Sequence, residues 1–338
     1  ESGFGSQLIG SQYVGDLWMA ARKLGRIFPL LDTFEMTAPT AYLPIEADLP
    51  EMQFVSENTS PTASAYTTSK VGSNRVTVAA SKFIVSMIYS LELEEDAIIP
   101  FVDFIMAQAR QSLAHYSDSA VLNGDTTNAA TGNINLDDAD PADTKHYLAF
   151  DGIRHANIVD NTNNAVDHSG AAITWNALMN LRGKMVDSTY LMDWGTPADA
   201  NDLIYIADPE TAIDIAKLSE VLTIDKYGQN ATILTGEVAR LGPWGMVSSQ
   251  AMSKTEADGK VSTTGASNTF GQIAVFNRRG FKVGWRRQVR VETFREVARD
   301  QNRIFFSLRM GLGRYSPTGA ASGLECAASL YDIAVGGS

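Results

Sequence analysis

Hydrophobic residues in the last third of the chain alternate with polar residues in two long runs. In residues 281–292 and again in 303–312, apolar side chains stand at nearly every second position, and the residues between them are mostly Lys, Arg, Gln, Glu or Ser. A period of two puts successive side chains on opposite faces of a strand. The pattern therefore predicts two strands, each with one buried and one polar face. A shorter apolar run at 272–276 precedes them.

A helical period predicts one long helix earlier in the chain. Between Ile98 and Leu122 the apolar residues recur every three or four positions, as on one face of a helix. Pro100 and the acidic residues before it suit a helix N-terminus. The residues Asn123-Gly124-Asp125 that follow tolerate a left-handed cap. A helix of about 24 residues is about 36 Å long.

Shorter elements are predicted around these. Helices are expected at residues 13–28, ending at Pro29, at 174–189, and at 209–218 with Asp208 as the N-cap and Pro209 as the first helical residue. Strand character is expected over residues 75–93, 203–206 and part of 236–252. Residues 123–172 are interpreted as loop-rich, and 254–268 as a polar hairpin tip.

Residues 36–76 have no continuous core pattern. Four prolines interrupt them, and small polar residues dominate from Thr59 to Ser73. Forty such residues are too many for a simple loop in a compact domain. An extended two-stranded excursion away from the body explains the pattern, with a disordered insertion as the alternative.

Charge is distributed unevenly along the 338 residues, of which 44% are hydrophobic. The net charge is −12, yet nine basic and only three acidic residues lie between Arg278 and Arg303, so this segment carries +6 and the rest −18. Such asymmetry indicates that copies of the chain contact each other through opposite charges. The candidate contact residues are Glu46, Asp48, Glu51, Glu57, Lys70, Arg278, Arg279, Arg286, Arg287, Arg290, Arg295 and Arg299.

Composition excludes several classes of protein. Acidity argues against a sequence-independent DNA binder, because phosphate neutralisation needs a basic face. No apolar run approaches the roughly 18 residues of a membrane span, and no leader pattern opens the chain. A single cysteine, Cys326, excludes an internal disulfide or a zinc site built from several cysteines. It is expected to be a buried apolar residue.

No catalytic motif is evident, so neither an enzyme nor a cofactor is expected. Gly311-Leu312-Gly313 lacks the third glycine of a dinucleotide fingerprint. The histidines, which are His115, His146, His155 and His168, do not recur at metal-ligand spacing. The acidic cluster of Asp137, Asp138, Asp140 and Asp143 lacks the glycine and distal Glu of a calcium loop. It is interpreted as a solvated turn, with a calcium site as the alternative.

The order of these elements resembles a tailed-phage major capsid protein of the Hong Kong 97 type over nearly the whole chain. An arm and an acidic Pro/Thr/Ser-rich hairpin come first, followed by a strand and a long helix that ends in Val121-Leu122-Asn123-Gly124-Asp125. Asp208-Pro209-Glu210 and Leu241-Gly242-Pro243-Trp244-Gly245 follow, and the strand pair closes in Arg314-Tyr315-Ser316-Pro317. No single motif is specific, but their order and spacing together are.

The resemblance implies an α+β fold with an N-terminal arm, an extended β-hairpin loop, a peripheral domain with a spine helix and a β-sheet, and an axial domain. The implied bounds are 1–35 for the arm, 36–80 for the extended loop, 81–125 with 270–317 for the peripheral domain, and 126–269 with 318–338 for the axial domain. The spine helix would span about 98–122. The absence of an initiator Met resembles the removal of an N-terminal scaffolding segment.

Some members of this family crosslink their subunits through a loop lysine, a neighbour's asparagine and a catalytic glutamate. Lys70 could stand at the lysine position, but the resemblance puts Asp300 at the asparagine and Ser307 at the glutamate position. Because the catalytic carboxylate is missing, no autocatalytic crosslink is expected.

We therefore expect a structural coat subunit that assembles into the pentamers and hexamers of an icosahedral shell around double-stranded DNA. The resemblance implies a virion location, synthesis in the host bacterial cytoplasm and no membrane. Portal, scaffolding and decoration proteins are further candidate partners. The nearest alternative is an encapsulin-type nanocompartment shell, which has the same fold and holds enzyme cargo. A hydrolase or lectin-like β-rich protein is a more distant one.

Overall fold

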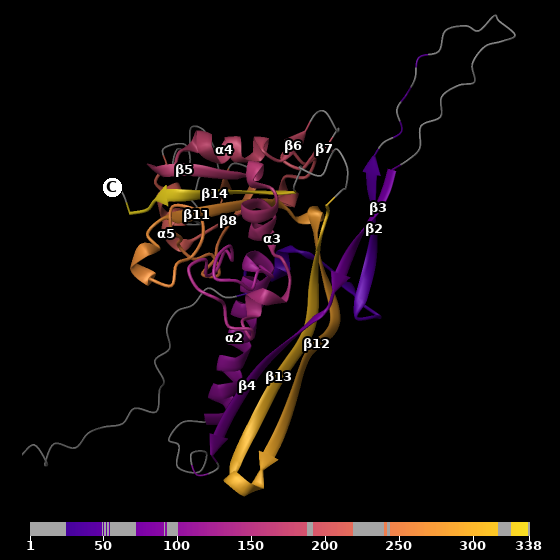
Figure 1. The fold of residues 1–338 in the computed structure, drawn as a ribbon, viewed down its shortest axis with the longest axis vertical. Helices are drawn as coiled ribbons and strands as arrows, with labels where there is room; N and C mark the ends of the chain where they lie inside the picture. The colour runs from indigo at the N-terminus through magenta and orange to yellow at the C-terminus, as the bar shows by residue number, and fades with distance from the viewer. Residues whose placement is uncertain are drawn as a thin grey trace, which may run out of the picture.

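The computed structural model describes residues 25–48, 72–90, 101–187, 192–218, 244–316 and 326–336, together with residues 50, 52, 54, 92, 240 and 241. Among its helices, none combines the length and apolar character that crossing a membrane requires. The described chain contains one long helix, two larger sheets and a projecting hairpin (Figure 1).

A four-stranded sheet and the long helix form the elongated lower part of the molecule in Figure 1. The strands, in spatial order, are β1 (Asp32–Glu35), β12 (Phe281–Glu296), β13 (Gln301–Arg314) and β4 (Ser81–Ser90). The helix is α2 (Phe101–Asn123). Its buried Ile105 and Leu113 share one core cluster with Ile304 and Phe306 of β13. The period-two pattern of β13 thus turns its apolar face toward α2.

A six-stranded mixed sheet forms the compact upper part. Its spatial order is β5 (Ala165–Ala172), β14 (Ala327–Ala334), β11 (Gly271–Asn277), β8 (Leu203–Ala207), β10 (Trp244–Ser248) and β9 (Arg240–Leu241). Every residue of β8 and β11 is buried. One face of these strands packs in a cluster with α4 (Trp175–Gly183) and α5 (Pro209–Ala216), and the other face joins the core of α2. Both faces of the central strands are therefore covered by the same chain.

Smaller elements complete the described fold. The projecting hairpin pairs β2 (Thr40–Asp48) with β3 (Gly72–Ala79), and β6 (Val186–Asp187) pairs with β7 (Met192–Asp193). A short helix α3 (Ile153–His155) continues into a π-helical turn, Ala156–Asp160. The 3-10 turns are Phe28–Leu30, His146–Ala149, Thr162–Asn164, Ala200–Asp202, Gly265–Ser267, Arg278–Gly280 and Val297–Arg299.

The Gly-Leu-Gly sequence of β13 marks the place where the projecting hairpin crosses the four-stranded sheet. A Cβ atom on Gly311 would lie 2.2 Å from the carbonyl oxygen of Ala79, and one on Gly313 would lie 2.6 Å from the Val78 side chain. Only glycine allows the two backbones to approach so closely. These glycines serve packing between strands.

Several predicted elements are confirmed. The two alternating strands are β12 and β13, the long helix is α2, and Asp208 caps α5 with Pro209 as its first residue. The excursion predicted for 36–76 is two-stranded where it is described. Cys326 is fully buried.

Other predictions were wrong. Residues 25–27 are not helical, because the backbone N–H groups of Arg26, Ile27 and Phe28 donate to the buried Asp118 carboxylate of α2. Residues 13–24 lie outside the described residues. The strand expected over 75–93 is two strands, interrupted at Ala80.

The segment interpreted as loop-rich contains α3, the π-helical turn and β5. The helix expected over residues 174–189 ends at Gly183 and is followed by β6. The strand β11, which falls within 270–317, pairs with β8 and β14 and not with the sheet of β12 and β13.

Candidate inter-subunit surfaces

The distal half of the β12–β13 hairpin carries apolar side chains that the described chain leaves uncovered. Phe294 is 58% exposed and Val297 is 77% exposed, and Val289 and Val291 are about half exposed. Because neighbours along a strand point to opposite faces, exposed side chains at 289–295 leave both faces of this segment open. Apolar side chains presented in this way are typical of a surface that another molecule covers.

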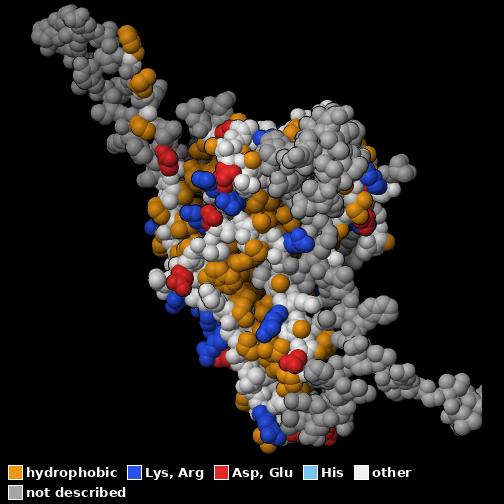
Figure 2. Space-filling model, turned by 180° about the vertical axis from the view of Figure 1, so that it is seen from behind, with side chains coloured by type: hydrophobic (Ala, Val, Ile, Leu, Met, Phe, Trp, Pro, Cys, Tyr) orange, Lys and Arg blue, Asp and Glu red, His pale blue; other side chains and the backbone are white. Residues whose placement is uncertain are grey.

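The strand register brings basic and apolar side chains together on the sheet face away from α2. Arg303 lies between Phe294 of β12 and Ile88 of β4. Ser307 lies in the same way between Arg290 and the exposed Ile84. Figure 2 shows Lys and Arg side chains along one edge of the lower half, beside a band of hydrophobic side chains. This face of the four-stranded sheet therefore combines positive charge with apolar contact area.

The acids of this segment pair with its own arginines. Glu292 lies 2.8 Å from Arg290, and Asp300 lies 3.7 Å from Arg295. Glu296 lies 3.4 Å from Arg299 and also contacts Arg303. Exposed pairs of this kind contribute about 0–1 kcal/mol each. Nine bases against three acids still leave the segment strongly positive.

The other four candidate arginines also contact their own chain. Arg278 and Arg279 both bind the nearly buried Asp202, with an Arg278 Nε–Asp202 Oδ1 distance of 2.9 Å. Arg286 donates to the carbonyl oxygen of Met36 at 3.3 Å, and Arg287 donates to Ser307 Oγ at 3.0 Å. Sequence reasoning missed Asp202, which is distant in the chain and belongs to a 3-10 turn.

The projecting hairpin is anchored along its described strands and exposed farther out. The Tyr315 hydroxyl donates to the carbonyl oxygen of Glu46, whose side chain is exposed, and the Arg75 guanidinium stacks 4.6 Å from the Tyr42 ring centroid. Beyond them Phe54 is almost fully exposed. Asp48 ends β2, while Glu51, Glu57 and Lys70 lie outside the described residues.

Two of the positions considered for a crosslink lie in different parts of the β12–β13 hairpin. Asp300 has a φ of +50° and lies in the turn between β12 and β13. Ser307 is buried in β13, where its hydroxyl accepts from Arg287. These positions hold neither the asparagine nor the glutamate that the reaction uses.

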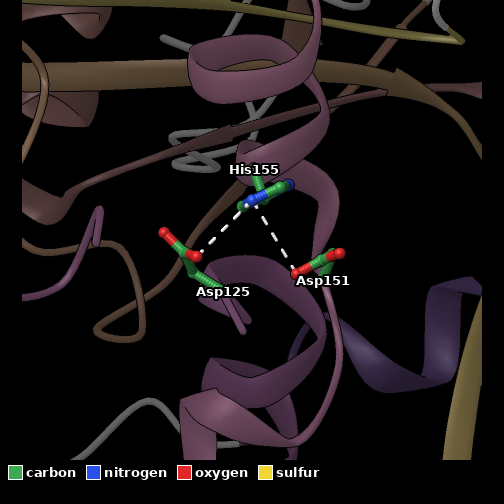
Figure 3. A group of neighbouring side chains, drawn as sticks. All are labelled: Asp125, Asp151 and His155. Carbon is green, nitrogen blue, oxygen red and sulfur yellow. Dashed lines mark ion pairs between the residues drawn. The ribbon is translucent and has the colours of Figure 1, made fainter. Parts of the chain in front are cut away.

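Two histidines lie in more structured surroundings than the sequence indicated. His146 packs on the Tyr116 ring, and its Nε2 lies 2.9 Å from Ser119 Oγ. Burial, with His115 and Lys145 nearby, lowers the pKa of His146 to about 4. His155 is buried, and its Nε2 faces both Asp125 and Asp151 (Figure 3).

The four aspartates of the acidic loop do not share one site. Asp138 accepts bonds from Ser262 and Thr263, and those from Thr263 lower its pKa most. Asp143 accepts from Asn128 at 2.8 Å. Asp137 gathers instead with two acids of the segment 256–258, near Lys260. Burial and the charge of Asp258 raise the pKa of Asp137.

Comparison with known proteins identifies relatives by structure. No family model and no curated protein matches the chain. A solved structure from Mycobacterium phage Bobi is similar, with 16% identity, a TM-score of 0.64 and 98% of both chains covered. One from Microbacterium phage Oxtober96 has 15% identity, a TM-score of 0.64 and 96% and 97% coverage. The capsid of a native GTA particle, computed with C5 symmetry, has 15% identity, a TM-score of 0.61 and 98% and 97% coverage. The α+β capsid fold predicted from the sequence is confirmed.

Proposed function

We propose that this chain is the major capsid protein of a tailed phage, and that many copies form an icosahedral shell around double-stranded DNA. The observation that carries the proposal is the coverage of the match to a GTA capsid chain, 98% of this chain and 97% of that one. A match of this extent includes the projecting hairpin as well as the compact core. The likeness to phage chains of similar length adds support.

The two larger sheets would correspond to the two domains of a capsid subunit. In this proposal α2, β4, β12 and β13 belong to the peripheral domain, residues 81–125 and 270–317 apart from β11. The six-stranded sheet belongs to the axial domain, residues 126–269 and 318–338 together with β11, which pairs with β8 and β14. Residues 1–35 form the arm and 36–80 the extended loop.

Subunits would associate through the acidic hairpin of one copy and the arginine-rich hairpin of the next. Glu46 and Asp48, with Glu51 and Glu57 farther along, supply the negative partner. Heterologous contacts of this kind generate rings when the rotation closes. Because exposed ion pairs contribute little, contact area must supply most of the assembly energy. Exposed apolar residues such as Phe54 and Phe294 provide that area.

The role in this proposal is mechanical and involves no turnover. The subunit would be made in the bacterial cytoplasm and reside in the virion, where the net charge of −12 keeps the shell from adhering to packaged DNA. Portal, scaffolding and decoration proteins are the further partners that such a shell would take.

A nanocompartment shell with protein cargo is the second candidate. The phage and GTA capsid chains described above favour the phage role. Contents decide between the two, because a phage shell holds DNA and a nanocompartment holds an enzyme.

Electron microscopy of the purified full-length chain tests the proposal. We expect closed shells with five-fold and six-fold clusters, and DNA inside particles isolated from their native source. Denaturing mass spectrometry should give single-chain masses, because the crosslinking carboxylate is absent. A dispersed single chain under all assembly conditions would refute a shell role. Particles with protein cargo and no nucleic acid would favour the second candidate.

A further inference from the structure

A histidine surrounded by carboxylates lies where the end of α2 meets α3, away from the surfaces described above. His155 Nε2 is 3.5 Å from Asp125 Oδ1 and 3.8 Å from Asp151 Oδ1. On the other side of the ring, Nδ1 is 3.3 Å from Asp160 Oδ2. His155 is only 6% exposed and Asp125 is completely buried. Figure 3 shows Asp125 and Asp151 both directed at the ring.

We propose that Asp125, Asp151 and His155 bind one divalent transition-metal ion of the Zn²⁺ class. The three ligand atoms lie within 4.8 Å of one another. Metal–ligand bonds of about 2.1 Å at a tetrahedral angle separate two ligand atoms by about 3.4 Å. The observed 3.5 Å and 3.8 Å are close to that separation. Both are too long for a hydrogen bond from Nε2.

Both carboxylate ligands accept hydrogen bonds from groups other than His155 and turn acceptor oxygens toward Nε2. Asp125 accepts from the backbone N–H groups of Thr127 and Ile134 at 2.9 and 2.8 Å. Asp151 Oδ1 accepts from the N–H and hydroxyl of Thr126 at 2.9 and 2.8 Å. Both carboxylates are thereby fixed in position. Nε2 and these oxygens lie close together at distances longer than a hydrogen bond, an arrangement that a metal ion bound to all three atoms would stabilise.

The surroundings of the cluster resemble the outer shell of a metal site. Asp160 lies beside Nδ1, without a hydrogen bond to it, on the side from which a carboxylate orients a metal-binding histidine. Asp160 is itself held by Arg314 at 2.6 Å. Arg154, fully buried, donates to Asn123 and Gly259 at 2.8 Å each. Asp125, Asp151 and Asp160 against these two arginines leave one negative charge before the histidine is counted, and this charge favours a cation.

An imidazole nitrogen together with carboxylate oxygens selects Zn²⁺ and similar ions over Mg²⁺, which prefers oxygen ligands in an octahedron. Asp151 is 41% exposed on its side chain, so an ion can enter from its side and retain water in the remaining position. The bound ion would tie the end of α2 to α3 and, through Asp160, to the end of β13.

The test measures Zn²⁺ and Co²⁺ uptake by the full-length protein after chelator treatment. We expect about one ion per chain, and Co²⁺ should give the visible absorption of a low-coordinate site. Asp151→Asn keeps an acceptor for Thr126 but loses the ligand charge, so Zn²⁺ affinity should fall more than about 10-fold. Asp160→Asn should weaken affinity by about 10- to 100-fold without removing a ligand.

Asp258→Asn is the matched control. Asp258 is 48% exposed, accepts the N–H of Lys260 as Asp151 accepts that of Thr126, and belongs to the other acidic group. Its variant should bind Zn²⁺ as the wild type does. Wild-type protein that takes up no Zn²⁺, or Asp151→Asn protein with unchanged affinity, would overturn the proposal. Zn²⁺ uptake that Asp258→Asn abolishes would overturn it as well, by assigning the ion to the other group.

Discussion

The six-stranded sheet and the distal β12–β13 hairpin are both β-structure with many apolar residues, yet only the central strands of the sheet are covered by their own chain. Every residue of β8 and β11 is buried, whereas Phe294 and Val297 are exposed. Burial of apolar surface is the main favourable term both in folding and in association. The sheet therefore stabilises the single chain, and the exposed apolar side chains of the hairpin can contribute only when a second molecule covers them.

The largest expected effect comes from truncating one phenylalanine in each region. Phe276→Ala opens a cavity in β11, where the ring is fully buried and packs edge-on against Phe281 at 5.9 Å. It should lower the free energy of unfolding by about 3–5 kcal/mol. Phe294→Ala should change it by less than about 0.5 kcal/mol and still reduce shell formation. Denaturant unfolding of unassembled subunits and particle yield measure the two effects.

The opposite pattern would contradict the comparison. If Phe294→Ala unfolded the isolated chain, the hairpin would belong to the folding core. If it left shell yield unchanged, the exposed apolar surface would have no role in assembly.

The second effect tests the place where the projecting hairpin crosses the sheet. Gly311→Ala would bring a Cβ to 2.2 Å from the carbonyl oxygen of Ala79, so a backbone must move. We expect a loss of about 3 kcal/mol, the upper end for overpacking, because the obstacle is backbone and cannot change rotamer. Gly183→Ala at the end of α4 meets no atom within 4 Å and is the control. Equal melting temperatures of the two variants would show that the backbone at the crossing accommodates the added methyl group without loss of stability.

The same contrast explains what the sequence could predict. Elements that depend on their own periodicity were found, such as α2, β12 and β13. The helical turns in the loop-rich segment were not, because distant partners stabilise polar residues there. Asn157 donates to Ser329 at 3.0 Å, and Asn164 to the carbonyl oxygen of Ala327 at 2.9 Å. No local pattern shows such partners.

For the candidate inter-subunit surfaces, too, local features could be predicted from the sequence and contacts with distant residues could not. Clustering of arginines was visible in the sequence, and so was the excess of positive charge. That Arg278 and Arg279 would both bind Asp202 was not, since the pairing depends on a turn beside β8. His155 was interpreted as a loop residue, and its contact with Asp125 was not predicted because Asp125 belongs to a separate segment at the end of α2.

A third prediction concerns pH and sharpens the comparison, because His146 is buried by its own chain. Its pKa of about 4 is lower than the usual 6.5, so the unfolded state binds the proton more readily. Stability that is present above pH 6.5 is lost as the pH falls toward 4. Allowing for partial exposure, the loss should be about 2 kcal/mol.

His146→Gln should remove this part of the pH dependence and retain a hydrogen bond to Ser119. Thermal unfolding at pH 7 and pH 4 measures it, with His168→Gln on β5 as the control that keeps the wild-type dependence. Because the burial is internal, the effect should be the same in free subunits and in shells. A difference confined to shells would place His146 at an interface.

The smallest expected effect on folding is that of Arg299→Ala, at the tip of the hairpin. The Arg299 side chain is 66% exposed and pairs with Glu296 at 3.4 Å, so the free energy of unfolding should change by less than about 0.5 kcal/mol. The rate of shell assembly should change more, because charged side chains speed association and salt screens their charge. The variant should assemble more slowly at low ionic strength and approach the wild-type rate in high salt.

Lys217→Ala is the control. It removes an exposed lysine paired with Asp214 at 2.8 Å on the six-stranded-sheet side, and should leave the assembly rate unchanged. Light-scattering kinetics over a salt series compare the three proteins. If both variants slowed assembly equally, net charge would account for the effect and the arginine-rich hairpin would have no special role.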